Sequence, residues 1–142
     1  MFVGVYLRFF YFLGGVALKN IYAVGLGSAL GGIVRYLLDL FFLSYGSLQP
    51  EFSLLLINIL GSYLLGFGLF YYSIKLKNTS QFLMHFWGMG FCGGFTTFAS
   101  FIYILSEAVL SEDIYIALIY ASISVFGGLA AFIIGILSAK AI

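Results

Sequence analysis

Four long apolar stretches, separated by short polar connectors, constrain the fold of this chain more than any other feature. They cover residues 21–42, 54–74, 82–109 and 114–139. Each is long enough to cross the hydrocarbon core of a bilayer as a helix, which takes roughly 20 apolar residues. Only 8% of the 142 residues are charged, whereas about a quarter are charged in a typical soluble domain. The sequence therefore predicts an all-α membrane protein with four transmembrane helices.

The third apolar stretch is too long for one straight helix across a bilayer. Its 28 residues would extend about 42 Å as an α-helix, whereas the hydrocarbon core is about 30 Å thick. Its centre reads GFCGGFTTFASF from Gly90 to Phe101, and glycine and threonine weaken a helix. We therefore expect the third helix to break mid-membrane, near residues 93–97. Unwound backbone at that depth has to be buried in protein or line a cavity, and its freed carbonyls can hold a small cation.

The first twenty residues form a region of uncertain structure, and residues 21–142 form the four-helix unit. The leader is apolar, but it contains Arg8 and ends near Lys19. It lacks the basic beginning of a signal peptide, and an arginine inside a span is costly. We expect an interfacial helix or an unstructured leader rather than a fifth span.

The charged residues are distributed asymmetrically about the predicted spans. Five of the six basic residues share the side that holds both termini: Arg8, Lys19, Lys75, Lys77 and Lys140. All five acidic residues fall on the opposite side: Asp39, Glu51, Glu107, Glu112 and Asp113. The positive-inside rule then predicts that both termini are cytoplasmic. Because the acids lie near the ends of the spans, no catalytic constellation is present, and we do not expect an enzyme.

Two polar side chains lie inside predicted spans and need partners there. Arg35 could reach the outer interface and pair with Asp39, or it could attract an anion or contact a second subunit. Asn58 lies beside Gly61 and Ser62, so it could bond to a neighbouring helix or donate a hydrogen bond into a pore. The spacing alone leaves both pairs of interpretations open.

Aromatic and hydroxyl side chains form two further pairs at helical spacing. Phe98 and Phe101 are three residues apart and project from one face of a helix. Such a pair usually packs in a core, but the edge of a phenyl ring is positive and could face an anion beside the break. Tyr120 and Ser124 share a face of the fourth span, where their hydroxyls could also bond back to their own helix.

These motifs resemble a known family. GFCGGFTTFASF closely resembles the third-helix signature of the Fluc (CrcB) fluoride channels, G-x-C-G-G-hydrophobe-T-T-F-S-T-F. GSALGGIVRY, INILGSYLLG and YASISVFGG are similar to the motifs of the first, second and fourth helices of that family. The resemblance covers residues 21–139 in the right order and spacing. The third-helix motif is highly specific, and the other three support it.

The resemblance implies a fluoride-specific channel subunit that works as an antiparallel dimer with two pores. Cytoplasmic fluoride would leave passively across the plasma membrane of a prokaryote. The implied fluoride pore residues are Phe98, Phe101, Asn58, Ser100, Tyr120 and Ser124. Main-chain carbonyls of Gly93 and Thr96 from both subunits would hold a structural Na⁺ at the dimer centre. Arg35 would lie at a vestibule or dimer contact.

The chain departs from the family pattern at three places. Ala99 replaces the usual serine, Ile104 stands where many members carry a glutamate, and the leader is extra. The charge asymmetry also bears on assembly, because an antiparallel homodimer needs both orientations of one chain. We therefore expect the partner to be an oppositely oriented paralogous subunit, with a homodimer as the alternative.

Two other functions fit parts of the sequence. A small multidrug exporter shares the four-helix format with opposed subunits, but it needs an acid at the centre of the first helix, where this chain has Arg35. A non-conducting partner subunit with decayed pore residues is the second, and Ala99 and Ile104 are hints toward it. Besides fluoride and a second subunit, the expected partner is membrane lipid, and no nucleic acid is expected.

Overall fold

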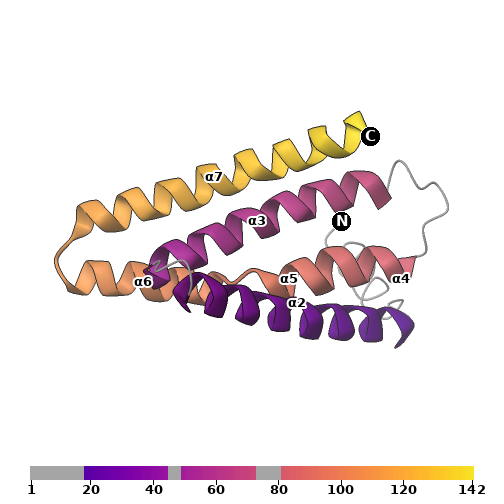
Figure 1. Ribbon diagram of the computed structural model, residues 1–142, viewed down its shortest axis with the longest axis horizontal. Helices are drawn as coiled ribbons and strands as arrows, with labels where there is room; N and C mark the ends of the chain where they lie inside the picture. Colours follow the sequence, from indigo (N-terminus) through magenta and orange to yellow (C-terminus); the bar gives the residue numbers. More distant parts are fainter. Residues whose placement is uncertain (1–17, 45–48, 73–80) are drawn as a thin grey trace, which may run out of the picture.

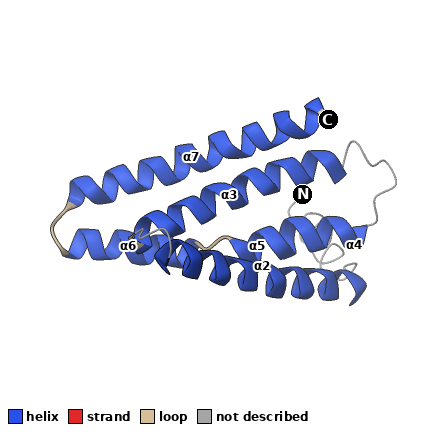
Figure 2. Cartoon of the chain, in the orientation of Figure 1, coloured by secondary structure: helices blue, strands red, loops and turns tan. Residues whose placement is uncertain are grey.

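The computed structural model describes residues 18–44, 49–72 and 81–142, and within them the chain is helical with no strand (Figure 2). The helices, in chain order, are α2 (Leu18–Ser44), α3 (Pro50–Phe70), α4 (Gln81–Met84), η2 (His85–Cys92), α5 (Gly93–Phe95), α6 (Phe98–Leu110) and α7 (Ile114–Ala141). Four stretches are long and apolar enough to cross a membrane: Asn20–Ser44, Pro50–Phe70, Gln81–Leu110 and Ile114–Ala141. The prediction of an all-α protein with four membrane helices is confirmed.

The four spans run alternately in opposite directions and form a bundle (Figure 1). The start of α2, the end of α3, α4 and the end of α7 lie at one end of this bundle. The most extensive interfaces join α3 to α7 and α2 to η2 and α5. Ile57 and Phe95 are almost fully buried between the helices, whereas large apolar side chains are exposed along the outer faces of α2 and α7. Such outer faces are expected where lipid takes the place of water.

Small residues allow α2 to approach the third span closely. A Cβ atom added at Gly31 would collide with the backbone carbonyl of Phe91, and one added at Gly94 would collide with the carbonyl of Ser28. The Ser28 hydroxyl donates a hydrogen bond to the Gly90 carbonyl at 3.3 Å. Membrane helices commonly pack in this way, because small residues let two backbones meet.

The third span is interrupted at Thr96 and Thr97, which confirms the predicted break. Both residues have extended backbone, with φ −91° and ψ 159° at Thr96 and φ −144° and ψ 118° at Thr97. Gly93 remains helical, so the interruption falls at the end of the predicted region rather than across its glycines. The helix restarts at Phe98, where the Thr97 hydroxyl caps it by accepting a hydrogen bond from the Ser100 N–H at 3.3 Å.

The segment before the break is a π-helix of eight residues, His85–Cys92, which the sequence analysis did not anticipate. π-Helical turns are rare and occur mostly as single turns inside α-helices, frequently at functional sites. Their formation depends on how the widened turns pack against neighbours. Amino-acid composition therefore does not predict a π-helix.

The expectations for the leader and for part of the charge pattern lie outside the described residues. They concern residues 1–17, which include Arg8, and residues 73–80, which include Lys75 and Lys77. Among the residues that are described, Lys140 lies in the last turn of α7. Glu51 lies in the first turn of α3, and Asp113 caps α7, so both acids lie at the opposite end of the bundle.

Candidate functional site

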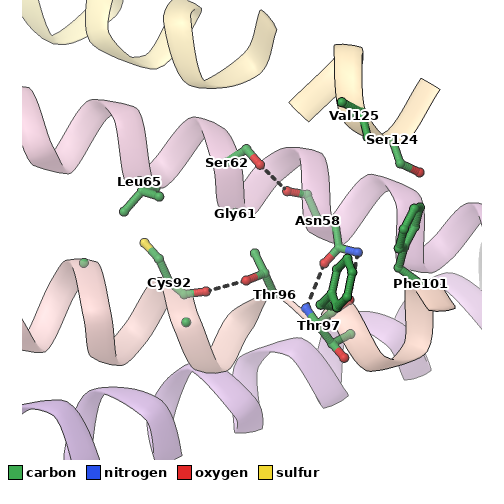
Figure 3. A pocket seen from close by; sticks show the side chains of 13 residues that line it. Asn58, Gly61, Ser62, Leu65, Cys92, Thr96, Thr97, Phe101, Ser124 and Val125 are labelled. Atoms are coloured by element: carbon green, nitrogen blue, oxygen red, sulfur yellow. Dashed lines mark hydrogen bonds between the residues drawn. The ribbon is translucent and has the colours of Figure 1, made fainter. Parts of the chain in front are cut away.

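A cavity of about 360 Å³ lies beside the break in the third span. Its walls come from α3, from both sides of the break and from α7 (Figure 3). Six of the nine site residues predicted from the sequence line it: Asn58, Gly93, Thr96, Phe98, Phe101 and Ser124. The folded chain thus brings together three spans at the point where the backbone is unwound.

The two phenylalanines form a pair at the cavity. Their ring centroids lie 5.6 Å apart with an angle of 34° between the ring planes. Phe101 also stacks on Tyr120 of α7, with centroids 5.9 Å apart and 23° between the planes. Phe98 is 74% exposed. Its ring therefore lies at the surface of the single chain, where another molecule can contact it.

Asn58 reaches from α3 to the break and bonds to both backbone groups of Thr97. Its Oδ1 accepts a hydrogen bond from the Thr97 N–H at 2.9 Å, and its Nδ2 donates to the Thr97 carbonyl at 3.3 Å (Figure 3). This arrangement fixes the orientation of the amide, because a backbone N–H can only donate and a carbonyl can only accept. One of the two Nδ2 hydrogens is still free to bind a ligand in the cavity.

Ser124 contributes a hydroxyl from α7. Its Oγ is buried and has no hydrogen-bond partner among the described residues. The Tyr120 hydroxyl lies close to Ser124, but the hydrogen bond that it donates goes to the Glu51 carbonyl at 3.4 Å. A buried hydroxyl without a partner is costly unless a ligand or water completes its hydrogen bonding.

Two main-chain carbonyls at the break are available to a ligand. The usual donor to the Gly93 carbonyl is the N–H four residues on, but that group, on Thr97, bonds to Asn58 instead. The Thr96 carbonyl accepts no hydrogen bond from the described residues. No cluster of His, Cys, Asp or Glu that could hold a metal occurs in the described part of the chain. A small hard cation there would therefore depend on main-chain oxygens, which suit Na⁺.

Three predicted site residues do not line this cavity. The Ser100 backbone N–H and hydroxyl lie against the Thr97 hydroxyl in the cap of α6, each at 3.3 Å. Tyr120 lines a second cavity of about 610 Å³ between α3, α6 and α7, where Ile104 also lies.

Arg35 lies on α2, away from both cavities, and its Nε is buried with no hydrogen-bond partner. The pairing with Asp39 that the spacing allowed is not among the interactions of the described residues. Asp39 instead accepts a hydrogen bond from the hydroxyl of Ser53, on α3, at 2.5 Å.

The sequence analysis missed Thr97, Cys92 and Ser62 as cavity residues. Thr97 stands in the break itself, and a mid-span amide needs a partner, so an Asn58–Thr97 contact could have been proposed from the two facts together. Cys92 is buried, and Ser62 donates back to the Asn58 carbonyl at 2.9 Å. Neither of these two residues carried a distinguishing signal.

Comparison with known proteins gives consistent matches over almost the whole chain. The family model described as "CrcB-like protein, Camphor Resistance (CrcB)" matches residues 22–136. The chain belongs to the CrcB family. This membership sets aside the small multidrug exporters, which the sequence analysis kept as an alternative.

Relatives within the CrcB family are named for fluoride conduction. The chain is 37% identical over 123 residues to the fluoride-specific ion channel FluC of Flavobacterium psychrophilum, which covers 87% of this chain and 98% of that protein. It is 38% identical over 124 residues to FluC of Chlorobium chlorochromatii, covering 85% and 92% of the two chains. It is 39% identical over 120 residues to FluC of Gloeobacter violaceus, covering 84% and 94%.

Proposed function

We propose that this chain is a subunit of a fluoride-specific ion channel that lets cytoplasmic fluoride leave the cell passively. The names of its relatives support this function. The observation that carries it in this chain is the cavity at the break, which is lined by two phenyl rings, an amide and an unpaired hydroxyl without any charged side chain. Such a site attracts a small anion by partial charges alone.

Partial charges suit a channel because binding has to be weak enough for release. The edges of Phe98 and Phe101, the free N–H of Asn58 and the hydroxyl of Ser124 replace part of the hydration shell of fluoride. A full positive charge at this depth would hold the anion and slow its exit. Fluoride passes through the pore by moving between several weak binding sites, one after another.

The remaining predicted residues have supporting roles in this proposal. Tyr120 extends the path outward, because its ring stacks on Phe101 and it also lines the second cavity. Ser100 helps to hold the first turn of α6. Arg35, whose Nε is unpaired, lies at a vestibule or dimer contact.

The channel works as an antiparallel dimer in this proposal, with carbonyls of Gly93 and Thr96 from both subunits holding a structural Na⁺. The exposed ring of Phe98 supports a subunit contact at this face. So does Gly93, around which an added Cβ would meet no atom within 4 Å. The bound Na⁺ would neutralise carbonyl dipoles that otherwise face one another across the interface. The asymmetric charges favour an oppositely oriented paralogous subunit as the partner, with a homodimer as the alternative.

The channel lies in the plasma membrane of a prokaryote with both termini in the cytoplasm. Five basic residues on the side of the termini support this orientation. Fluoride would then enter from the end of the bundle that holds Lys140 and leave at the end that holds Glu51.

A fluoride electrode tests this proposal with proteoliposomes loaded with potassium fluoride. The chain is reconstituted alone and then with its paralogous subunit, and efflux starts on addition of a potassium ionophore. We expect fast fluoride efflux and no chloride efflux from the mixed vesicles, and little efflux from vesicles that hold this chain alone. No fluoride efflux in either preparation would contradict channel function. Fast efflux from the chain alone would contradict the need for a second subunit.

A further inference from the structure

The interruption of the third span leaves both peptide groups of Thr97 without helical partners at the depth of the membrane. A broken helix leaves N–H and C=O groups without helical partners, and lipid offers none. At Thr97 both groups are bonded to the Asn58 side chain, at 2.9 Å for the N–H and 3.3 Å for the carbonyl (Figure 3). A single amide thus takes the place of two missing backbone partners.

Asn58 is well placed to hold the break because its own helix is firmly packed. The neighbouring Ile57 is fully buried, and a Cβ added at Gly61, one turn further along α3, would collide with the side chain of Thr96. The Asn58 amide therefore projects from a part of α3 that already lies directly against the break.

The contact continues from Thr97 into α6. The Thr97 hydroxyl accepts a hydrogen bond from the Ser100 N–H and so caps the helix that begins with Phe98. The first turn of that helix carries both Phe98 and Phe101. The orientation of the two rings is therefore connected, through Thr97, to the Asn58 amide.

We propose that Asn58 is a positioning residue: its amide fixes the backbone of Thr97 and thereby aims Phe98 and Phe101 at the cavity. The same bond diverts the Thr97 N–H from the Gly93 carbonyl and leaves that oxygen free. This is a second role beside the donation of the remaining N–H to fluoride. The effect on fluoride efflux rests on the proposed channel function, whereas the contact with Thr97 does not.

Two substitutions at Asn58 separate hydrogen bonding from space filling. Asn58→Leu keeps the approximate shape of the side chain but neither accepts nor donates a hydrogen bond. In Asn58→Asp a protonated carboxyl can still accept from the Thr97 N–H and donate to its carbonyl, whereas an ionised one can only accept. Ser124→Ala is the matched control, because it removes a donor from the cavity without touching Thr97.

The experiment uses the full chain labelled with ¹⁵N-threonine in lipid nanodiscs. The chain has three threonines, Thr79, Thr96 and Thr97, so three backbone amide signals are expected and can be assigned with Thr79→Ser and Thr96→Ser. In Asn58→Leu we expect the Thr97 amide to exchange with solvent about tenfold faster than in the original chain. The Thr96 amide, which donates to the Cys92 carbonyl at 3.0 Å, should be much less affected. In Ser124→Ala both amides should exchange at the original rates.

Fluoride efflux is measured on the same variants. We expect Asn58→Leu and Ser124→Ala both to slow efflux, while only Asn58→Leu alters Thr97. An unchanged Thr97 exchange rate in Asn58→Leu would overturn the positioning role. If the original chain and its partner conduct no fluoride, the channel proposal fails, and the Thr97 signals still decide whether Asn58 holds the break.

The Asn58→Asp variant keeps the test decisive if Asn58→Leu does not fold. A Thr97 amide that exchanges as slowly in Asn58→Asp as in the original chain supports the proposal, because a carboxyl oxygen accepts from the Thr97 N–H in either protonation state. A Thr97 amide that exchanges fast at every pH would overturn it.

Discussion

Two residues that line the cavity at the break, Ser124 and Phe98, present groups that another molecule can contact. The Ser124 hydroxyl is buried without a partner among the described residues, and such a group costs about 1–3 kcal/mol. Phe98 exposes most of its ring beside the same cavity. A small apolar residue at position 124 would avoid the cost of the unpaired hydroxyl, whereas lipid or a second subunit can cover the exposed ring of Phe98. In the proposed channel, a passing fluoride ion would contact both groups.

A change at Phe98 tests the aromatic contribution directly. In proteoliposomes that hold this chain and its paralogous subunit, we expect Phe98→Ile to reduce fluoride efflux at least tenfold, because the isoleucine side chain is apolar but has no positive ring edge. The assembly itself should remain intact by size-exclusion chromatography.

Phe126 provides the matched control for this substitution. It is 71% exposed, close to the exposure of Phe98, and lies on α7 outside both cavities. Phe126→Ile should leave efflux unchanged. Equal efflux from Phe98→Ile and the original chain would contradict the role of the ring.

At the scale of elements, α2 packs closely against the third span directly before the break. Gly31 and Gly94 let the two backbones meet on one side of the third span, while α3 meets it on another through Asn58. The broken segment is therefore held between two helices. Its extended backbone at Thr96 and Thr97 agrees with the weak helix propensity of threonine and is held in addition by these neighbours.

Gly31 and Gly25 make it possible to test this contact within one helix. An added Cβ at Gly31 would meet backbone atoms of Phe91 and Phe95, whereas one at Gly25 would meet nothing within 4 Å. We expect Gly31→Ala to lower the free energy of unfolding by about 1–3 kcal/mol, since backbone cannot easily move aside.

Thermal unfolding in detergent measures the effect. Gly25→Ala should be neutral or slightly stabilising, because alanine favours a helix over glycine by about 1 kcal/mol. Equal melting temperatures for the two variants would show that α2 does not approach the third span as closely as the structure has it.

At the scale of the whole molecule, the distribution of charge predicts how the bundle is oriented in the membrane. The described acids Glu51, Glu107 and Asp113 belong to one end of the bundle and Lys140 belongs to the other. The positive-inside rule predicts a single orientation for such a subunit, and this favours a paralogous partner in the proposed antiparallel dimer, with a homodimer as the alternative.

Orientation can be measured with reporters fused to the carboxy terminus. A green fluorescent protein fusion should fluoresce and an alkaline phosphatase fusion should be inactive, because the terminus is expected in the cytoplasm. Changing Lys75, Lys77 and Lys140 together to alanine should produce a mixed orientation.

Acidic residues supply the control for the lysine substitutions. Glu112→Gln with Asp113→Asn removes as many charges as two of the lysine changes, yet it should leave the orientation unchanged, since acids contribute little to the positive-inside rule. An active phosphatase fusion on the original chain would contradict the assigned orientation.

Much of the fold could be predicted from local properties of the sequence. The length of each apolar stretch predicted four spans, and the surplus length and weak helix formers of the third predicted its break. These features depend on each residue and its immediate neighbours in the chain, together with the fixed thickness of a bilayer. The family resemblance pointed to six of the thirteen residues that line the cavity.

Only the tertiary structure decided which partner each polar group has. Asn58 bonds to a residue 39 positions away, Asp39 bonds to Ser53 rather than pairing with Arg35, and Ser100 supports a helix cap instead of lining the cavity. The spacing of residues within one helix leaves such choices open, because they depend on the register and rotation of neighbouring helices. Those quantities arise from packing across the whole bundle, and no single stretch of sequence contains them.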